Sequence, residues 1–457
     1  MKHLSNDDMI IKNSRHIHLV GIGGSGMCPI AELLLSKGYT VSGSDRTESA
    51  NTQRIKNLGA KVFIGQKQEN IEGAEIVGYS AAVHEDNPEL KAARNAGIPT
   101  FERSKILGAI TRFYNNTIGV SGTHGKTTVS SMITQILLLN KRDPSAVIGG
   151  KLPLVDSACV SGGSDTLVCE SCEFVDSFLE FSPDISVLLN IDNDHLDYFK
   201  TMDNLVASFT KFCAKSKVCY YNGDDKLCKK AVSGIAANTV SYGISEDNFY
   251  HPENVTAGKF GFSFDVVRDR ITVGHLDMNV PGRHNIYNGL VSFAVCFEMG
   301  VEAEGINEAI KKFTGAGRRF QFIGEKRGVT VVDDYAHHPT EIAATLSAAK
   351  SLEYKRVITV FQPYTYSRVA LLKDDMIKAL SLADKVFLTP IVASREENIY
   401  GVSSEDLADA LPDGKVISDY HQLAEEMAES AGDGDIIITM GAGDIFKVAG
   451  MILEKLK

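Results

Sequence analysis

The chain of 457 residues carries 47 Lys and Arg against 58 Asp and Glu, and its formal net charge of −11 argues against a general nucleic-acid-binding protein. Hydrophobic residues make up 44% of the chain, enough for packed cores, yet no apolar run approaches the roughly 18 residues of a membrane helix, so we expect no membrane insertion. Eight cysteines are too sparse for a disulfide scaffold and the polar first residues lack a signal peptide's apolar core, so we expect a cytoplasmic protein with reduced thiols.

Apolar runs of strand length alternate with longer helical patterns along the whole chain, which is typical of parallel α/β sheets. At about 150 residues per domain the length suggests about three domains, and we place them at residues 1–106, 107–314 and 315–457. In the first domain we expect strands at residues 16–20, 40–44, 61–64 and 75–80 and a helix at residues 29–37.

A glycine-rich turn, Gly21-Ile22-Gly23-Gly24-Ser25-Gly26, follows the first expected strand. Gly21, Gly23 and Gly26 match GxGxxG, and Asp45 ends the next strand about twenty residues later, as in the dinucleotide-binding fingerprint. The pattern indicates that a diphosphate lies at the start of a helix, which suits both NAD and a UDP-sugar. Close packing of helix on strand is the purely structural alternative.

The second domain contains the segment GVSGTHGKTT, residues 119–128, between an expected strand at 116–120 and an expected helix at 129–139. Such a turn directs backbone N–H groups at an anion, while Lys126 suits the β- and γ-phosphates and the Thr127 hydroxyl suits Mg²⁺. The usual phosphate-loop spacing has glycine five residues before Gly125, and that position is Val120. Further strands are expected at residues 166–169 and 185–191, and helices at residues 205–215 and 285–299.

Acidic and polar residues follow two of these expected strands. Glu170 and Glu173 come after the first, and the polar run 189–197 ends the second. Ligand sites form at the carboxyl ends of parallel strands, and Mg²⁺ takes oxygen ligands, so Thr127 with Glu173 could hold one ion, and His195 could reach a second or orient a ligand. The alternatives are solvated surface acids and, for the Cys169/Cys172 pair, a redox or zinc site or simply two semi-buried thiols.

In the third domain we expect strands at residues 329–332, 356–361, 385–389 and 435–440 and helices at residues 341–352, 367–380 and 420–430. Arg318 and Arg319 lie at its entry, and polar residues end two of its strands, at 333–341 and 361–368. An arginine suits charge that develops on a transferred phosphate. Thr340 and the Asp333/Asp334 pair could also be helix caps, as could the His and Asn residues that open the helix near residue 285.

The motif order GxGGxGM, GTHGKTT, NxDxDHLD, GRHNxxN, GRRF, DDYAHHPTEI and FQPYxYSR, from about residue 16 to residue 443, resembles the Mur ligases. The resemblance implies an α/β fold of three domains. The N-terminal Rossmann-like domain would bind a UDP-sugar rather than NAD, and a central P-loop ATPase-type domain with a mainly parallel sheet would bind ATP. The C-terminal Rossmann-like domain would close over the site and help bind an amino acid.

The resemblance also implies roles for individual residues. Lys126 matches the phosphate-binding lysine, Thr127 and Glu173 match Mg²⁺ ligands, and His195 matches the histidine associated with a second ion. Arg319 falls on a γ-phosphate contact and Asp334 on a ribose contact, while His337 and Arg368 fall where amino-acid and acyl-phosphate contacts are expected. The phosphate loop would comprise Gly122, Thr123, His124, Gly125, Lys126, Thr127 and Thr128; adenine would contact His284, Asn285 and Asn288; and the substrate-binding residues would be Gly21, Gly23, Gly24, Ser25, Gly26, Asp45, Ser80 and His338.

Two stretches depart from the family pattern. Cys172 stands where many relatives have Asp, beside the expected metal ligand Glu173. Tyr364 and Thr365 stand where many relatives have His and Arg, which leaves Arg368 as the cation of that loop.

The activity that the resemblance implies is ATP-dependent joining of L-alanine to the lactyl carboxylate of UDP-N-acetylmuramate in peptidoglycan precursor synthesis. The reaction would pass through an acyl phosphate and use two Mg²⁺ ions, which Mn²⁺ can replace, on a monomer or homodimer. The alternatives are addition of a recycled peptide to the same sugar nucleotide, a folate polyglutamylating ligase, an NAD-binding oxidoreductase fused to an ATPase, and a nucleotide-binding regulatory module without turnover.

Overall fold

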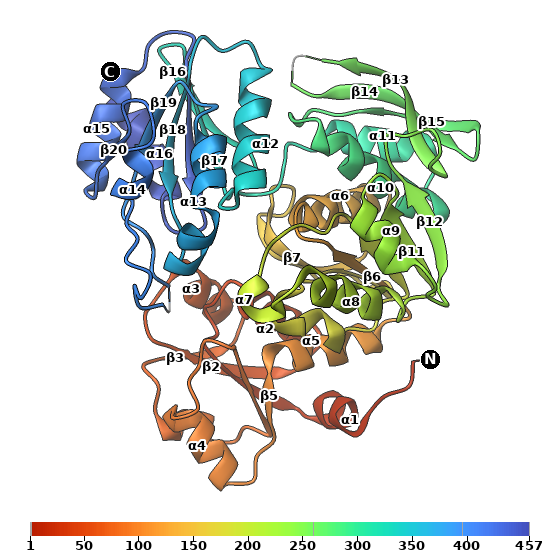
Figure 1. The fold of residues 1–457 in the computed structure, drawn as a ribbon. Coiled ribbons are helices and arrows are strands. Elements are labelled where there is room, and N and C mark those ends of the chain that lie inside the picture. Colours follow the sequence, from red (N-terminus) through yellow and green to blue (C-terminus); the bar gives the residue numbers. More distant parts are fainter. Residues whose placement is uncertain (1, 259, 395, 457) are drawn as a thin grey trace. The chain divides into compact units, whose positions relative to one another are not determined.

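The computed structural model describes residues 2–258, 260–394 and 396–456 and has the mixed α/β fold that the sequence predicts (Figure 1). The chain forms two compact units. Unit 1 comprises Met1–Glu253, Asp265–His275 and Tyr287–Ile310, and unit 2 comprises Asn254–Phe264, Leu276–Ile286 and Lys311–Lys457. Three sheets run through the chain. Among the described residues no helix combines the length and the apolar character needed to cross a bilayer.

The first sheet has five parallel strands in the order β3-β2-β1-β4-β5. The strand order reverses between β1 and β4, and in sheets of this kind the carboxyl ends at such a reversal flank the ligand site. The strands are β1 (His16–Val20), β2 (Thr40–Asp45), β3 (Lys61–Ile64), β4 (Ile76–Tyr79) and β5 (Thr100–Glu102). The helices of this segment are α1 (Asn6–Asn13), α2 (Cys28–Ser36), α3 (Ala50–Asn57), η1 (Gln68–Ile71), α4 (Pro88–Asn95) and α5 (Arg103–Phe113).

The central sheet has the strand order β15-β14-β13-β12-β11-β10-β6-β9-β7-β8. It is parallel from β13 to β7, and β8 is antiparallel to β7. The strands are β6 (Asn116–Ser121), β7 (Ser145–Leu152), β8 (Ser157–Val160), β9 (Thr166–Glu170), β10 (Ile185–Leu188), β11 (Val218–Asn222), β12 (Asn238–Tyr242), β13 (Tyr250–Ala257), β14 (Phe262–Arg268) and β15 (Ile271–Asp277). The helices are α6 (Lys126–Leu139), η2 (Phe174–Glu180), α7 (Leu196–Phe199), α8 (Met202–Cys213), α9 (Lys226–Val232), α10 (His284–Glu298) and α11 (Ala303–Lys311).

The third sheet has the order β16-β17-β21-β18-β19-β20 and is parallel except for the edge strand β16. Neighbouring residues of β17 pack into two different cores, Val332 with α12 and α13 and Val331 with α15 and α16. Because helices cover both faces of this sheet, the sequences of its inner strands are continuous apolar runs. The strands are β16 (Gln321–Lys326), β17 (Val329–Asp334), β18 (Val357–Gln362), β19 (Lys385–Leu388), β20 (Lys415–Val416) and β21 (Ile436–Gly441). The helices are α12 (Pro339–Lys350), α13 (Tyr366–Leu380), α14 (Glu405–Ala408), α15 (Tyr420–Ser430) and α16 (Phe446–Lys455).

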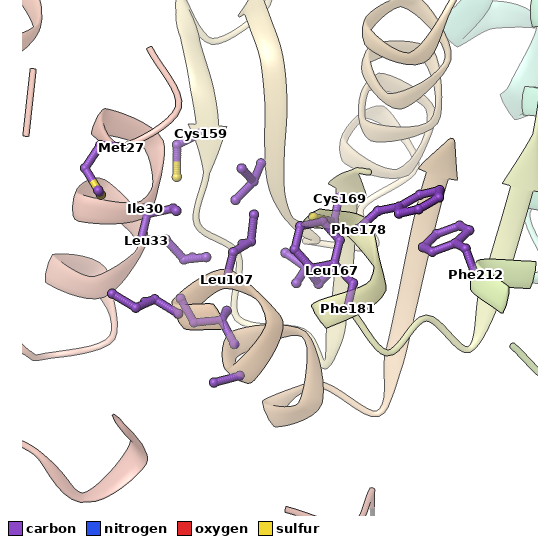
Figure 2. Close-up of a cluster of buried hydrophobic side chains, with 14 of the residues drawn as sticks. Met27, Ile30, Leu33, Leu107, Cys159, Leu167, Cys169, Phe178, Phe181 and Phe212 are labelled. Carbon is purple, nitrogen blue, oxygen red and sulfur yellow. The ribbon is translucent and has the colours of Figure 1, made fainter. Parts of the chain in front are cut away.

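Helix α5 joins the first and central sheets of unit 1 through one hydrophobic core. Figure 2 shows Leu107 of α5 between Ile30 and Leu33 of α2 on one side and Leu167 and Phe178 on the other. Close approach depends on Gly108, because a Cβ there would lie 2.5 Å from the Glu180 carbonyl oxygen. The glycine loop of the first sheet and the phosphate loop of the central sheet therefore belong to one packed body.

Buried charges reinforce this packing near the N-terminus. Lys2 Nζ lies 2.9 Å from Asp184 Oδ2, just before β10. Arg112 of α5 donates to Asp8 Oδ2 of α1 at 2.8 Å and to the Glu180 carbonyl oxygen at 2.7 Å. These contacts tie α1, α5 and the entry to the central sheet together.

The expected strands and helices lie within a few residues of the observed ones, and two ends differ for local reasons. Helix α6 begins at Lys126 rather than Val129, because Gly125 at φ 87° is already its N-cap. Strand β10 ends at Leu188 rather than Ile191, because the next residues turn to hydrogen-bond the phosphate loop.

We predict that Phe178→Ala destabilises unit 1 by about 3–5 kcal/mol, the usual cost of an aromatic-to-alanine cavity. The Phe178 side chain is fully buried, stacks on Phe212 at 4.7 Å between ring centroids and meets Phe209 edge-on at 5.4 Å. Urea unfolding would measure the loss. Leu139→Ala, at a side chain that is 39% exposed, is the control and should change the free energy of unfolding by less than about 1 kcal/mol; equal effects of the two would contradict the packing described.

Candidate active site

The phosphate loop connects β6 to α6, and two glycines give it its shape. Gly122 has φ 134° and Gly125 has φ 87°, backbone conformations that other residues rarely adopt. A Cβ at Gly122 would also lie 2.9 Å from Leu189 Cβ and 3.1 Å from the Asn190 backbone nitrogen. Gly122 therefore makes the turn for which the usual spacing would place glycine at position 120.

Asn190, just beyond β10, braces this loop. Its Oδ1 accepts from the His124 N–H at 2.8 Å, its Nδ2 donates to the His124 carbonyl at 3.0 Å, and its own carbonyl accepts from the Thr123 N–H at 3.0 Å. The Asp192 N–H donates to Thr123 Oγ1 at 2.9 Å, and His124 Nε2 lies 3.2 Å from Asp192 Oδ2. Thr123 and His124 thus hold the loop against the end of β10.

Lys126, the first residue of α6, forms an ion pair with the buried Glu173. Its Nζ lies 2.9 Å from Glu173 Oε2 and donates to the carbonyl oxygens of Gly122 and Thr123 at 2.5 and 3.0 Å. Burial alone would lower the pKa of Lys126, but the Glu173 carboxylate outweighs it and the pKa is raised. The lysine is therefore charged, and it neutralises the carboxylate that the sequence predicts as a metal ligand.

The donors around this pair fit Mg²⁺. Thr127 is buried at the start of α6, and its hydroxyl and the Glu173 carboxylate are the oxygen ligands that Mg²⁺ prefers. Glu170 has a different task, since its Oε2 accepts from the Gly149 N–H at 2.7 Å and so braces β7. Burial and the nearby Glu173 raise the pKa of the Cys172 thiol to about 11. Cys172 is thus a neutral thiol at pH 7 and a poor metal ligand, and Cys169 is likewise a free, buried thiol.

His195 lies beside the segment that carries Glu173. Its ring centroid is 4.8 Å from that of Phe174, the residue that follows Glu173. Its backbone is left-handed at φ 57°, as are Val175 and Asp176 at φ 49° and 58°. Asp176 Oδ2 accepts from the Tyr198 hydroxyl at 2.9 Å, which ties this strained turn to α7. Strain of this kind is typical of functional sites, where surrounding contacts hold it.

Helix α10 carries His284, Asn285 and Asn288. A Cβ at Gly125 would lie 3.1 Å from Asn288 Oδ1, so the Asn288 amide borders the phosphate loop. Asn285 Nδ2 donates to the Pro281 carbonyl at 2.6 Å, and the His284 ring lies against Gly282. Asn285 therefore stabilises the turn before α10.

The first glycine turn lies at the strand reversal between β1 and β4. The Gly23 N–H donates to Asp45 Oδ2 at 2.9 Å, and a Cβ at Gly23 would lie 2.6 Å from Thr52 Cγ2. Ser80, after β4, lies next to Gly21, since its Oγ is 3.6 Å from where a Gly21 Cβ would be. Gly24 and Ser25 are exposed. The substrate residues predicted from β1, β2 and β4 therefore meet, with Asp45 bonded to the turn itself.

In unit 2 the two adjacent arginines have different surroundings. Arg318 Nε donates to Asp333 Oδ2 at 2.9 Å, and its Nη1 and Nη2 donate to the carbonyls of Gly443 and Gly441 at 3.0 and 2.6 Å. Arg319 lies 3.7 Å from Glu341 Oε1 and 5.3 Å from the centroid of the Tyr335 ring. Arg318 is therefore part of the scaffold, and the partly exposed Arg319 is the one that suits a ligand.

The end of β17 and the start of α12 gather the remaining candidates. The N–H groups of Phe320 and Ala336 both donate to the Asp334 carboxylate at 2.7 Å. His337 Nδ1 lies 3.0 Å from the Tyr335 carbonyl oxygen and 3.2 Å from Glu341 Oε2. His338, rather than Thr340, caps α12, because its ring accepts from the helix backbone.

Arg368 lies in the first turn of α13, the helix that follows β18 after a three-residue connection. Thr365, the N-cap of that helix, has φ 63°, and the Tyr364 hydroxyl donates to Ser394 Oγ at 3.1 Å. Since β17, β21 and β18 are neighbouring parallel strands, their carboxyl ends share one edge of the sheet. Arg368 and the residues after β17 therefore lie at the same edge.

Two residues in this geometry had no role predicted from the sequence. Asn190 forms three hydrogen bonds to the phosphate loop, and Glu341 contacts both Arg319 and His337. Both lie inside quoted motifs, NxDxDHLD and DDYAHHPTEI. Motif membership was thus the available signal, whereas their partners depend on contacts between segments far apart in the sequence.

Three family models match the chain: "Mur ligase family, catalytic domain" at residues 16–115, "Mur ligase middle domain" at 120–296, and "Mur ligase, glutamate ligase domain" at 318–443. The chain is 42% identical to the UDP-N-acetylmuramate–L-alanine ligase of Caldicellulosiruptor saccharolyticus, over 96% of this chain and 98% of that protein. It is 41% identical to the enzyme of the same name from Caldanaerobacter subterraneus, over 98% and 99% of the two chains.

Solved structures of Mur ligases are also similar to this chain. The crystal structure of UDP-N-acetylmuramate–alanine ligase from Thermotoga maritima superposes with a TM-score of 0.82 at 27% identity and covers 96% of this chain and 98% of that one. A murein peptide ligase from Psychrobacter arcticus superposes with a TM-score of 0.74 at 22% identity, over 97% and 98% of the two chains, a likeness of fold.

We predict that the stability of unit 2 depends on the ionisation of Asp334. Burial raises the pKa of Asp334 from 3.8 to about 6, although the Arg319 charge opposes the rise. Between about pH 4 and pH 6 the folded unit binds more protons than the unfolded chain, so its free energy of unfolding falls as the pH rises. A shift of about two pKa units corresponds to roughly 3 kcal/mol.

The measurement is urea unfolding of the wild type and Asp334→Asn at pH 4 and pH 7. The wild type should lose about 2–3 kcal/mol relative to the variant over this interval. Asp413→Asn, at an exposed position of the same unit, is the control. The same pH dependence in wild type and Asp334→Asn would contradict the raised pKa.

Proposed function

The chain belongs to the Mur ligase family, and from that premise we propose that it joins L-alanine to the lactyl carboxylate of UDP-N-acetylmuramate, converting ATP to ADP and phosphate, in peptidoglycan precursor synthesis. Relatives named for this reaction match nearly the full chain at 41–42% identity. The observation that carries the proposal is the Lys126–Glu173 ion pair beside the glycine loop, in the same packed unit as a second glycine turn. An ATP-driven ligase for a sugar nucleotide needs both loops.

Each proposed domain binds one substrate. Residues 1–106 bind UDP-N-acetylmuramate through Gly21–Gly26, Asp45 and Ser80. Residues 107–314 bind ATP through Gly122–Thr128 and α10, and residues 315–457 bind L-alanine. Both nucleotide substrates are cytoplasmic metabolites, so we place the enzyme in the cytoplasm, as a monomer or homodimer.

The chemistry requires activation because a carboxylate has no good leaving group. A lactyl carboxylate oxygen attacks the γ-phosphorus, and the bond from that phosphorus to ADP breaks, which gives an acyl phosphate and ADP. The L-alanine amine then attacks the acyl carbon, the carbon–oxygen bond breaks, and phosphate leaves. The amine proton passes to His337 or to the departing phosphate.

Electrostatic neutralisation is the main task of the protein in phosphoryl transfer. Lys126 exchanges the Glu173 carboxylate for the β- and γ-phosphates, and Arg319 neutralises charge on the transferred phosphoryl group. Thr127 and Glu173 would hold one Mg²⁺ and His195 would orient a second, with Mn²⁺ able to replace them; bound ions supply positive charge to the phosphates. Asp334 contacts the ATP ribose, His337, His338 and Arg368 contact the amino acid and acyl phosphate, and Asn288 contacts adenine.

We predict that ADP release requires both UDP-N-acetylmuramate and L-alanine, measured by a coupled assay with each component omitted in turn. Replacing L-alanine by the tripeptide L-Ala-γ-D-Glu-meso-diaminopimelate tests the peptide-recycling alternative and should give little turnover. ADP release at the same rate without the sugar nucleotide would overturn the proposal.

In the same assay Lys126→Ala should lower kcat by at least about 10³-fold, because the phosphoryl group loses its buried cation. Lys141→Ala, at an exposed lysine beyond the other end of α6, is the matched control and should leave kcat within about twofold. Equal turnover of the two variants would remove Lys126 from the mechanism.

A further inference from the structure

Arg103, at the start of α5, is a cation for which the described part of the chain provides no counter-ion. Its side chain is partly buried, and no hydrogen bond or ion pair connects it to any residue that the structure describes. The neighbouring Glu102 does not neutralise it by contact, because the Ser104 N–H donates to Glu102 Oε2 at 2.8 Å and the Ser104 hydroxyl also bonds there. A guanidinium that is withdrawn from water without a partner favours binding of an anion.

The position of Arg103 on its helix makes its charge still less favourable when no anion is bound. Arg103 is the first residue of α5, where the helix dipole is positive and disfavours a cation. Three residues on, the helix is anchored by the buried Ile106, and Gly108 packs against the Glu180 backbone. The Arg103 backbone is therefore fixed, and its charge remains where local helix electrostatics oppose it.

The guanidinium lies against the first glycine turn. A Cβ at Gly26 would lie 3.1 Å from Arg103 Nη1 and 3.4 Å from its Cζ. Within the turn, Gly21 and Ile22 donate to the Ser44 carbonyl, Gly23 donates to Asp45 and Gly24 donates to Gly21. Among the described residues the N–H groups of Ser25 and Gly26 have no acceptor. Two backbone donors and one guanidinium thus lie together.

The Arg103 charge also acts on Cys169, which lies near the end of β9. Burial raises the pKa of the Cys169 thiol to about 12, and the Arg103 charge is close enough to oppose that rise. The following residue, Glu170, directs its carboxylate to the Gly149 N–H. The positive charge at the glycine turn is therefore left for a ligand.

We propose that Arg103 binds the diphosphate of the sugar nucleotide at the first glycine turn, together with the N–H groups of Ser25 and Gly26. The inference rests on the proposed function and adds a residue to it. A guanidinium presents paired donors that match two phosphate oxygens. The diphosphate rather than the lactyl carboxylate is the ligand, because Arg103 contacts the turn whose backbone donors suit phosphate.

The experiment is isothermal titration of the full-length protein with UDP, UDP-N-acetylglucosamine and UDP-N-acetylmuramate, which share the diphosphate, while only the last carries the carboxylate. Arg103→Ala should raise the Kd of all three by about 10- to 100-fold, as expected for loss of charge-assisted hydrogen bonds. UMP, which lacks the second phosphate, should be affected less. Arg103→Lys should restore part of the affinity, because it keeps the charge but loses the paired geometry.

Two controls separate binding from folding. Lys105→Ala removes an exposed cation two residues along the same helix and should leave every Kd within about twofold. The Kd of ATP and the thermal midpoint of Arg103→Ala should match the wild type. In turnover, the KM for UDP-N-acetylmuramate should rise while the KM for L-alanine is unchanged.

Unchanged affinity for UDP in Arg103→Ala would overturn the proposal, as would a loss confined to UDP-N-acetylmuramate, which would assign the guanidinium to the carboxylate. Either result leaves the proposed function intact if the wild type still releases ADP with L-alanine. Failure of the wild type to do so would instead remove the function on which the inference rests.

Discussion

The contact on which the rest of the site depends is the ion pair between Lys126 and the buried Glu173, whose charged atoms lie 2.9 Å apart. Removing two charges from water is costly, and such a pair seldom adds stability by itself. Under the proposed function the pair would be exchanged on binding: a phosphate would replace Glu173 beside the lysine, and a divalent cation would replace the lysine beside Glu173. The protein therefore holds both charges in place before the nucleotide arrives, and the Asn190 hydrogen bonds keep the loop in the shape that this requires.

Because neighbouring strands are parallel, the candidate site residues that follow them lie at the same edge of each sheet, the edge formed by the carboxyl ends of the strands. Around β6 the phosphate loop, the Glu173 segment and the Asn190–His195 segment follow neighbouring strands, and around β1 the glycine turn, Asp45 and Ser80 do the same. Helix α5 packs the first and central sheets into one body through Leu107 and Gly108 (Figure 2). A sugar nucleotide and ATP bound to unit 1 would thus be held by a common scaffold.

Much of this could be predicted from the sequence because turn chemistry is local. Gly21–Gly26 and Gly122–Lys126 each follow an apolar strand and precede a helix, so this strand–turn–helix geometry was predictable from about ten residues. The different contacts of adjacent residues could not be predicted in this way. Arg318 is held by Asp333 and two glycine carbonyls, whereas Arg319 lies beside Glu341 and the Tyr335 ring, and His338 rather than Thr340 caps α12. Arg103 belongs to none of the motifs. Its proposed role depends on its position beside Gly26, which lies 77 residues away in the sequence. The partly exposed strands β13–β15 likewise lack a continuous apolar run.

The central claim is that ATP energises the lactyl carboxylate by direct phosphoryl transfer. The most direct test uses UDP-N-acetylmuramate with ¹⁸O in the lactyl carboxylate, with mass spectrometry of the phosphate released in the presence of L-alanine. Attack by the carboxylate on the γ-phosphorus, followed by displacement at the acyl carbon, transfers one labelled oxygen to that phosphate. Unlabelled phosphate alongside amide product would contradict the account.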